Sequence, residues 1–93
     1  MIRSFHSHEE EQIFNREYSR HFPHAIQPVA LRKLWMIDAS MSLNDLRIPP
    51  GNHLEKLHGK RKGQYSIRIN KQWRICFAWK ADNAYDVEIV DYH

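Results

Sequence analysis

Three side chains that can transfer protons end the sequence, as Asp91, Tyr92 and His93. A carboxylate, a phenol and an imidazole can each give or accept a proton during a reaction. They follow a segment whose alternation predicts a strand, and they lie near a strongly basic stretch. A frayed chain end accounts for the same residues equally well, because terminal residues are commonly disordered.

Positive charge gathers just before this terminus. Residues 53–80 hold eight Lys or Arg and one acid, Glu55, whereas residues 81–93 hold four acids and no Lys or Arg. Aromatic side chains are interleaved with the basic ones, a mixture that suits a phosphate-rich partner. A solvated strand face explains the pattern equally well. The basic residues are Lys56, Lys60, Arg61, Lys62, Arg68, Lys71, Arg74 and Lys80.

The other candidates for chemistry give weaker signals. Seven histidines are present, but a zinc site needs three or four converging ligands, usually with cysteine, and the chain has one cysteine. We therefore predict surface histidines and no metal site. Cys76 falls inside a predicted strand, which favours a plain strand residue over a catalytic thiol. The glycines do not match a phosphate-binding loop.

The elements that position these residues follow from hydrophobic spacing and from breaks. Apolar residues three and four apart predict helices before the break at residues 49–52, and period-two alternation predicts antiparallel strands after it. The predicted segments are a short edge strand at 2–5, helices at about 7–21 and 26–39, a turn at 43–46, and strands at 64–70, 73–79 and 85–92.

This order of elements predicts an α+β fold in a single domain spanning residues 1–93. The two helices cover the apolar face of a three- to four-stranded antiparallel sheet. No apolar run approaches the ~20 residues that cross a bilayer, so we expect neither a membrane span nor a membrane partner. One cysteine suits a reducing cytoplasm.

Strand alternation also predicts register, because directly opposed residues share a face. Ile67 faces Ile75, which places Arg68 opposite Arg74 on the solvent-exposed face. Opposed like charges repel, so either a bound anion or the nearby Glu88 is expected to neutralise them.

The same rule predicts the second hairpin. Trp79 is expected opposite Tyr85, and Cys76 opposite Glu88. Tyr92 then falls on the face of the two arginines, while Asp91 and His93 fall on the other face unless the strand bends.

Several stretches resemble the HigB family, toxins of the RelE superfamily from bacterial toxin–antitoxin modules. They are MIRSF at the start, RKLWMIDA (32–39), PPGNHLE (49–55), GQYSIRIN (63–70), QWRICF (72–77) and VEIVDYH (87–93). The resemblance spans essentially the whole chain. It implies the RelE-like fold, a small antiparallel sheet with helices packed on one face, in agreement with the pattern of elements.

The resemblance also implies a function, a ribosome-dependent messenger-RNA endonuclease acting in the ribosomal A site beside 16S ribosomal RNA. The 2′-hydroxyl attacks the neighbouring phosphorus without a metal or other cofactor, leaving a cyclic phosphate and a 5′-hydroxyl. The implied partners are the ribosome, the message and a HigA-like helix-turn-helix antitoxin. The toxin is expected to associate with operator DNA only through this antitoxin. A non-catalytic binding protein of the same fold and a gyrase-inhibiting sibling toxin remain as alternatives.

By similarity, the catalytic residues are Asp91, Tyr92 and His93, with Arg74 clamping the phosphate. The base is either His53 or Glu55, because both fit the family's position before the first core hairpin. Arg68 is expected to support Arg74. The remaining basic residues are expected to contact ribosomal RNA nonspecifically: Lys56, Lys60, Arg61, Lys62, Lys71 and Lys80.

Overall fold

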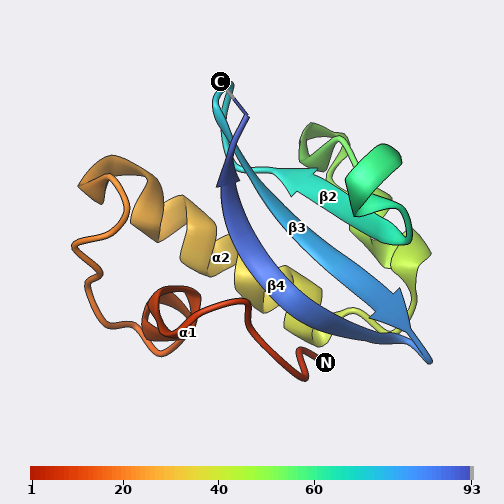
Figure 1. Cartoon of the computed structure of the whole chain (residues 1–93), viewed down its shortest axis with the longest axis horizontal. Coiled ribbons are helices and arrows are strands. Elements are labelled where there is room, and N and C mark those ends of the chain that lie inside the picture. The colour runs from red at the N-terminus through yellow and green to blue at the C-terminus, as the bar shows by residue number, and fades with distance from the viewer. Residues whose placement is uncertain (93) are drawn as a thin grey trace.

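A four-stranded antiparallel sheet in the order β1-β2-β3-β4 organises the protein (Figure 1). The computed structural model describes residues 1–92. The helices are α1 (His8–Phe14) and α2 (Gln27–Ala39), and the strands are β1 (Glu55–Lys56), β2 (Gln64–Arg68), β3 (Trp73–Lys80) and β4 (Asn83–Asp91). Short 3₁₀ turns lie at His24–Ile26, Leu43–Arg47, Pro50–Asn52 and Gly59–Arg61. The predicted α+β fold is confirmed.

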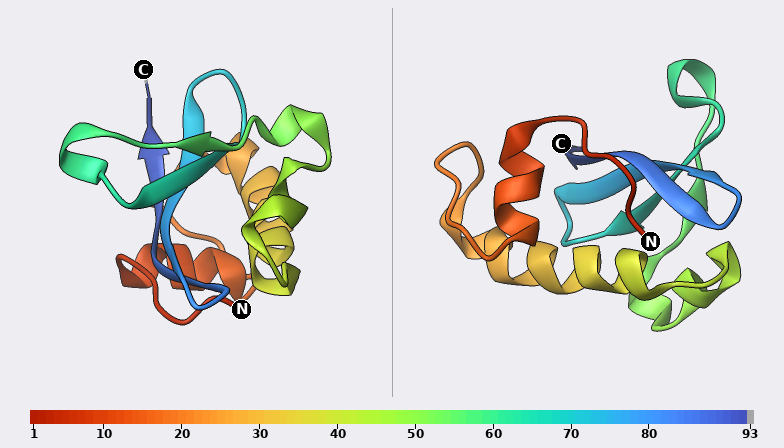
Figure 2. Two further views of the ribbon diagram at one scale, coloured as in Figure 1. Left: turned by 90° about the vertical axis from the view of Figure 1, so that its right-hand side faces the viewer. Right: turned by 90° about the horizontal axis from the view of Figure 1, so that it is seen from below.

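The helices cover one face of the sheet only. Figure 2 (right) shows α2 on one side of the sheet and the Gly59–Arg61 turn on the other. Ala30, Leu34 and Ile37 recur on one side of α2 and are fully buried. They pack in one cluster with the inward residues of the strands, including Ile67 and Ile75. The core thus occupies one face and leaves the other available for polar groups. Within residues 1–92, no helix is long and apolar enough to cross a bilayer.

The first helix is shorter than predicted. It ends at Phe14 instead of near residue 21, and Arg16 takes a left-handed φ of 65° as the chain turns away. The following loop is tied to α2 instead, because the buried Gln27 side chain accepts from the Ser19 amide (3.0 Å) and donates to the Phe22 carbonyl (3.0 Å). Periodicity alone does not foresee this tether.

The N-terminal segment lies along the free edge of β4, as the predicted edge strand would. It pairs through two isolated parallel bridges, Ile2 with Ala84 and Phe5 with Val87, without forming a longer strand. Further along the same edge, the buried Glu10 carboxylate accepts the Ile89 amide (3.0 Å) and the Ser7 hydroxyl. A side chain from α1 thereby satisfies an edge amide that no strand reaches.

The strand register is confirmed in the first hairpin and partly wrong in the second. Arg68 pairs with Arg74, as predicted, and Cys76 pairs with Glu88. Beyond that point, Trp79 lies opposite Ala84 instead of Tyr85. A β-bulge adds one residue to β4 near Asp86, whose φ is 54°. It shifts by one every pair between the bulge and the β3–β4 turn.

We predict that Glu10→Ala destabilises the fold. The substitution leaves the buried Ile89 amide without its acceptor, so the free energy of unfolding should fall by about 1–3 kcal/mol. Urea denaturation followed by circular dichroism measures the change. Glu11→Ala, an exposed position in the same helix, should change it little, and equal losses in both variants would contradict this role for Glu10.

Candidate active site

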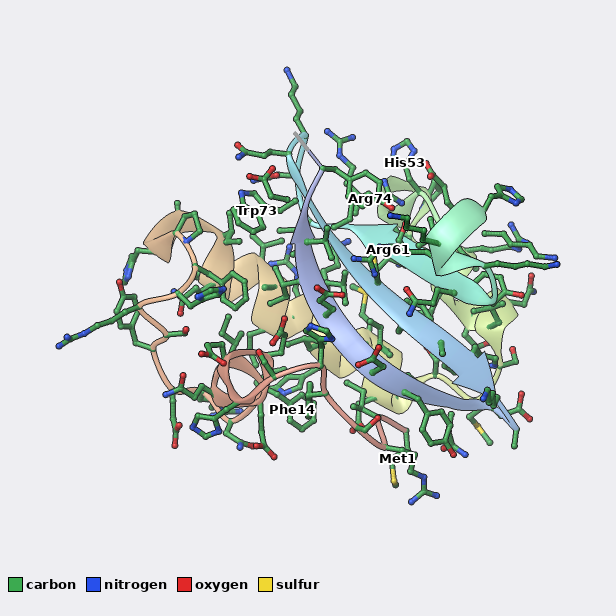
Figure 3. The ribbon with its side chains drawn as sticks, viewed as in Figure 1. Met1, Phe14, His53, Arg61, Trp73 and Arg74 are labelled. Carbon is green, nitrogen blue, oxygen red and sulfur yellow. The ribbon has the colours of Figure 1, made fainter. Side chains whose placement is uncertain are left out.

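A polar hollow of about 330 Å³ opens on the face of the sheet opposite the core. It is formed by the loop before β1, the β2–β3 hairpin and the end of β4. In Figure 3, His53 and Arg74 lie together at this end of the sheet, far from Phe14 and Met1. The lining residues are His53, Arg68, Asn70, Lys71, Arg74 and Tyr92.

Arg74 is the most firmly held charged group of the hollow. Its side chain is buried, whereas the sequence predicted a solvent-exposed position. Nε donates to the hydroxyl of the fully buried Ser66 (2.8 Å), and a terminal nitrogen donates to the His53 carbonyl. The other terminal nitrogen lies 3.8 Å from the Glu55 carboxylate. The prediction failed because the segment containing residues 53–61 folds over this face of the sheet.

The positive charge of the hollow is only partly neutralised by the protein. Arg68 lies directly opposite Arg74 in the neighbouring strand, and Lys71 follows in the hairpin loop. The expectation that Glu88 neutralises these arginines is wrong, because Glu88 pairs with Arg61 at 3.1 Å. A concave site lined by several cations favours an anionic ligand.

His53 is positioned by a buried polar tether to α2. The neighbouring Asn52 is fully buried; it accepts from Lys33 Nζ and donates to the carbonyls of Leu46 (3.1 Å) and Ile48 (3.4 Å). Burial, together with the nearby charge of Arg32, lowers the pKa of Lys33. His53 itself takes a left-handed φ of 45°, a strained conformation for a residue other than glycine.

This geometry separates the two candidate bases. His53 lines the hollow, and its backbone carbonyl also contacts Arg74. Glu55 approaches Arg74 with its carboxylate but does not line the hollow.

Tyr92 closes the hollow from the end of β4. Its ring lies over Arg74, 5.8 Å from the guanidinium carbon, and its Oη is 3.9 Å from the Cys76 sulfur. These contacts confirm that Tyr92 shares the face of the arginines. Burial raises the pKa of the Tyr92 phenol and contact with Cys76 adds to the rise, whereas the charges of Arg74 and Arg61 oppose it. The phenol is therefore neutral near pH 7 and can donate a hydrogen bond.

Asp91 is not brought into the hollow. Asp91 accepts a hydrogen bond from the Gln72 side-chain amide (3.1 Å) and does not line the hollow. His93 lies outside the described residues.

The remaining basic residues fall into three groups. Lys71 belongs to the hollow, and Arg61 is paired with Glu88. The others are exposed: Lys56, Lys60, Lys62 and Lys80.

Sequence reasoning missed Ser66, Asn70 and Asn52. Ser66 could have been found from the register, because it lies diagonal to Arg74 on the same face. The sequence marks Asn52 only as part of the break at residues 49–52. Nothing in its local sequence predicts the hydrogen bond from Lys33.

Comparison with known proteins gives a family. A family model described as the RelE-like toxin of the type II toxin–antitoxin system HigB matches residues 3–93. Toxin HigB-1 of Vibrio cholerae is 47% identical over 68 residues, covering 71% of this chain and 72% of that protein. The chain belongs to the HigB-like family of type II toxins. An uncharacterised protein of Haemophilus influenzae is 51% identical over 58 residues, covering 62% of this chain and 57% of that protein.

Solved structures place the HigB-like chain in the RelE fold. The YoeB–YefM toxin–antitoxin complex of Staphylococcus aureus, solved as a heterotetramer, matches all of this chain and 98% of that chain with a TM-score of 0.61 at 19% identity. A second YoeB–YefM complex from that organism matches with a TM-score of 0.56. These structures share the arrangement of sheet and helices.

We predict that Asn52→Ala destabilises the fold by releasing the loop that carries His53. The substitution removes the hydrogen bonds to Leu46 and Ile48 and leaves the Lys33 ammonium without its acceptor, which should cost about 2–3 kcal/mol of unfolding free energy. Chemical denaturation measures this loss. Asn44→Ala, at an exposed position, is the matched control, and similar stabilities for the two variants would contradict the tether.

Proposed function

We propose that this HigB-like toxin is a ribosome-dependent messenger-RNA endonuclease that cuts the message in the ribosomal A site. The observation that supports the proposal most strongly is the hollow in which the buried Arg74 lies beside Arg68, Lys71, Tyr92 and His53. RNA cleavage by the neighbouring 2′-hydroxyl needs a cationic clamp on the phosphate and groups that move protons. The hollow combines both kinds of group in a space suited to one phosphate linkage.

Arg74 is proposed to stabilise the pentavalent phosphorus, with Arg68 supporting it. A guanidinium already held by Ser66 and the His53 carbonyl needs little reorganisation as negative charge develops on the phosphate oxygens. Arginine also matches phosphate geometry better than lysine does, because its donors form a planar fork.

Proton transfer is assigned to two groups that line the hollow and, by the family resemblance, to two residues at the end of the sequence. We assign His53 as the base that takes the 2′-hydroxyl proton, because it lines the hollow, and Glu55 as the counter-ion of Arg74. The neutral phenol of Tyr92 is positioned to donate to a phosphate oxygen. The resemblance to the family assigns His93, supported by Asp91, to protonating the 5′-leaving oxygen. The reaction proposed is independent of metal.

The partners follow from the family and the charge distribution. The exposed lysines at 56, 60, 62 and 80 are proposed to contact phosphates of 16S ribosomal RNA. A HigA-like helix-turn-helix antitoxin is proposed to neutralise the toxin, and operator DNA is reached only through it. The YoeB toxins that share the fold were solved bound to an antitoxin. We place the toxin in the cytoplasm, where its ribosomal substrate is.

We predict that Arg74→Gln abolishes cleavage. Loss of the fixed cation should lower the cleavage rate by about 10²–10³-fold, the usual effect of removing one preorganised stabilising donor. Primer extension on messages from expressing cells measures cleavage, with circular dichroism to confirm folding. Arg68→Gln changes the less buried arginine opposite Arg74 and should reduce the rate without unfolding the protein. Arg32→Gln, on the exposed side of α2, is the control and should cleave normally. Wild-type cleavage by folded Arg74→Gln protein would overturn the assignment.

We predict that His53 and His93 are both required for cleavage. His53→Ala and His93→Ala should each lower the rate by about 10²–10⁴-fold, as expected for a missing general base or acid. His8→Ala, at an exposed position in α1, serves as the control in the same primer-extension assay. Normal activity of His53→Ala together with an inactive Glu55→Ala would show that Glu55 is the base instead of His53. If His93→Ala cleaves normally, His93 does not protonate the leaving oxygen.

A further inference from the structure

Arg61 behaves differently from the basic residues on either side of it. Lys60 and Lys62 are exposed, whereas the Arg61 side chain retains only 33% of its accessible surface. Its Nη1 donates to the Gln64 side-chain oxygen at 3.0 Å and to the Glu88 carboxylate at 3.1 Å. The turn that carries Arg61 lies on the face of the sheet opposite α2 (Figure 2). A side chain whose only role is to attract RNA would keep its charge in water.

The contacts of Arg61 lead to Tyr92. Its partner Glu88 lies directly opposite Cys76 in the neighbouring strand. Cys76 is fully buried, and its sulfur is 3.9 Å from Tyr92 Oη. The charge of Arg61 acts on both Cys76 and Tyr92. Arg61 is thus connected to the phenol through Glu88, which it contacts, and through Cys76, which lies opposite Glu88 and contacts Tyr92.

The Arg61–Glu88 pair joins separate parts of the chain. Arg61 ends the Gly59–Arg61 turn between β1 and β2, and Glu88 stands in β4, four residues before Tyr92. Because Glu88 keeps only 23% of its side-chain accessible surface, this pair is screened less than an exposed ion pair. The pair therefore ties the β1–β2 connection to β4, the strand that precedes Tyr92.

We propose that Arg61 and Glu88 are positioning residues for Tyr92. Their ion pair holds the β1–β2 connection over Cys76 and so keeps the phenol in place above Arg74, without contact between Arg61 and RNA. This inference deepens the proposed function and rests on it for its kinetic consequence. The competing interpretation is that Arg61 is one more phosphate contact, like Lys60 and Lys62.

Alkylation of Cys76 tests the geometry without any activity assay. The chain has one cysteine, so iodoacetamide labelling of the folded toxin, followed by mass spectrometry, reports on Cys76 alone. We expect Arg61→Gln to raise the labelling rate by about tenfold or more. Loss of the Arg61 charge by itself slows labelling, because that charge opposes the rise in the Cys76 pKa. Faster labelling therefore reports exposure.

Two further variants make the labelling result decisive. Lys62→Gln removes the same charge from an exposed neighbour and should label at the wild-type rate. The exchanged pair, Arg61→Glu with Glu88→Arg, should recover most of the protection. Equal labelling of Arg61→Gln and Lys62→Gln, or no recovery in the exchanged pair, would overturn the proposal.

Cleavage on programmed ribosomes then separates positioning from RNA binding. Arg61→Gln should lower the maximal rate by about tenfold while the half-saturating toxin concentration stays within twofold of wild type, and the exchanged pair should restore part of the rate. Lys62→Gln should do the reverse, raising the half-saturating concentration alone. An Arg61→Gln variant that behaves like Lys62→Gln overturns the proposal. Absence of cleavage by the wild-type toxin refutes the proposed function instead, and labelling of Cys76 still decides whether the ion pair holds the connection.

Discussion

The burial of one guanidinium, that of Arg74, sets the conditions that the rest of the site must meet. A charged group taken out of water destabilises a fold unless hydrogen bonds and an opposite charge replace its hydration. Here Ser66 and the carbonyl of His53 supply hydrogen bonds, and Glu55 lies 3.8 Å away. Two of these three groups belong to the loop before β1 and to β1 itself, so that segment must lie against Arg74.

The loop in turn depends on the helical side of the molecule. Asn52 connects it to Lys33 of α2, and its amide also holds the carbonyls of Leu46 and Ile48. A continuous set of contacts therefore runs from the core helix, through the loop, to the guanidinium in the hollow. Such a site is preorganised, because its charged group is held before any ligand arrives. The alternation of the strands keeps this polar face separate from the apolar core.

The alternation of residues along the strands predicted which site residues share a face of the sheet, and no more than that. The pairing of Ile67 with Ile75 placed Arg68 opposite Arg74, and the face of Tyr92 followed from the same parity. Parity failed between the bulge near Asp86 and the β3–β4 turn, because the extra residue shifts the pairs of residues 83–85 by one. The burial of Arg74 was missed for a different reason, since it arises from contacts between residues distant in sequence, such as His53 with Arg74.

The central claim, that this HigB-like toxin cuts messages only on the ribosome, is tested most directly by mapping the ends of the cut RNA. Purified wild-type toxin is incubated with naked message and with ribosomes stalled at a known codon. The account predicts cleavage within the A-site codon of stalled ribosomes, leaving the 5′-hydroxyl and cyclic phosphate ends of attack by the 2′-hydroxyl. Intact message on the ribosome, or equal cleavage of naked RNA, would contradict it.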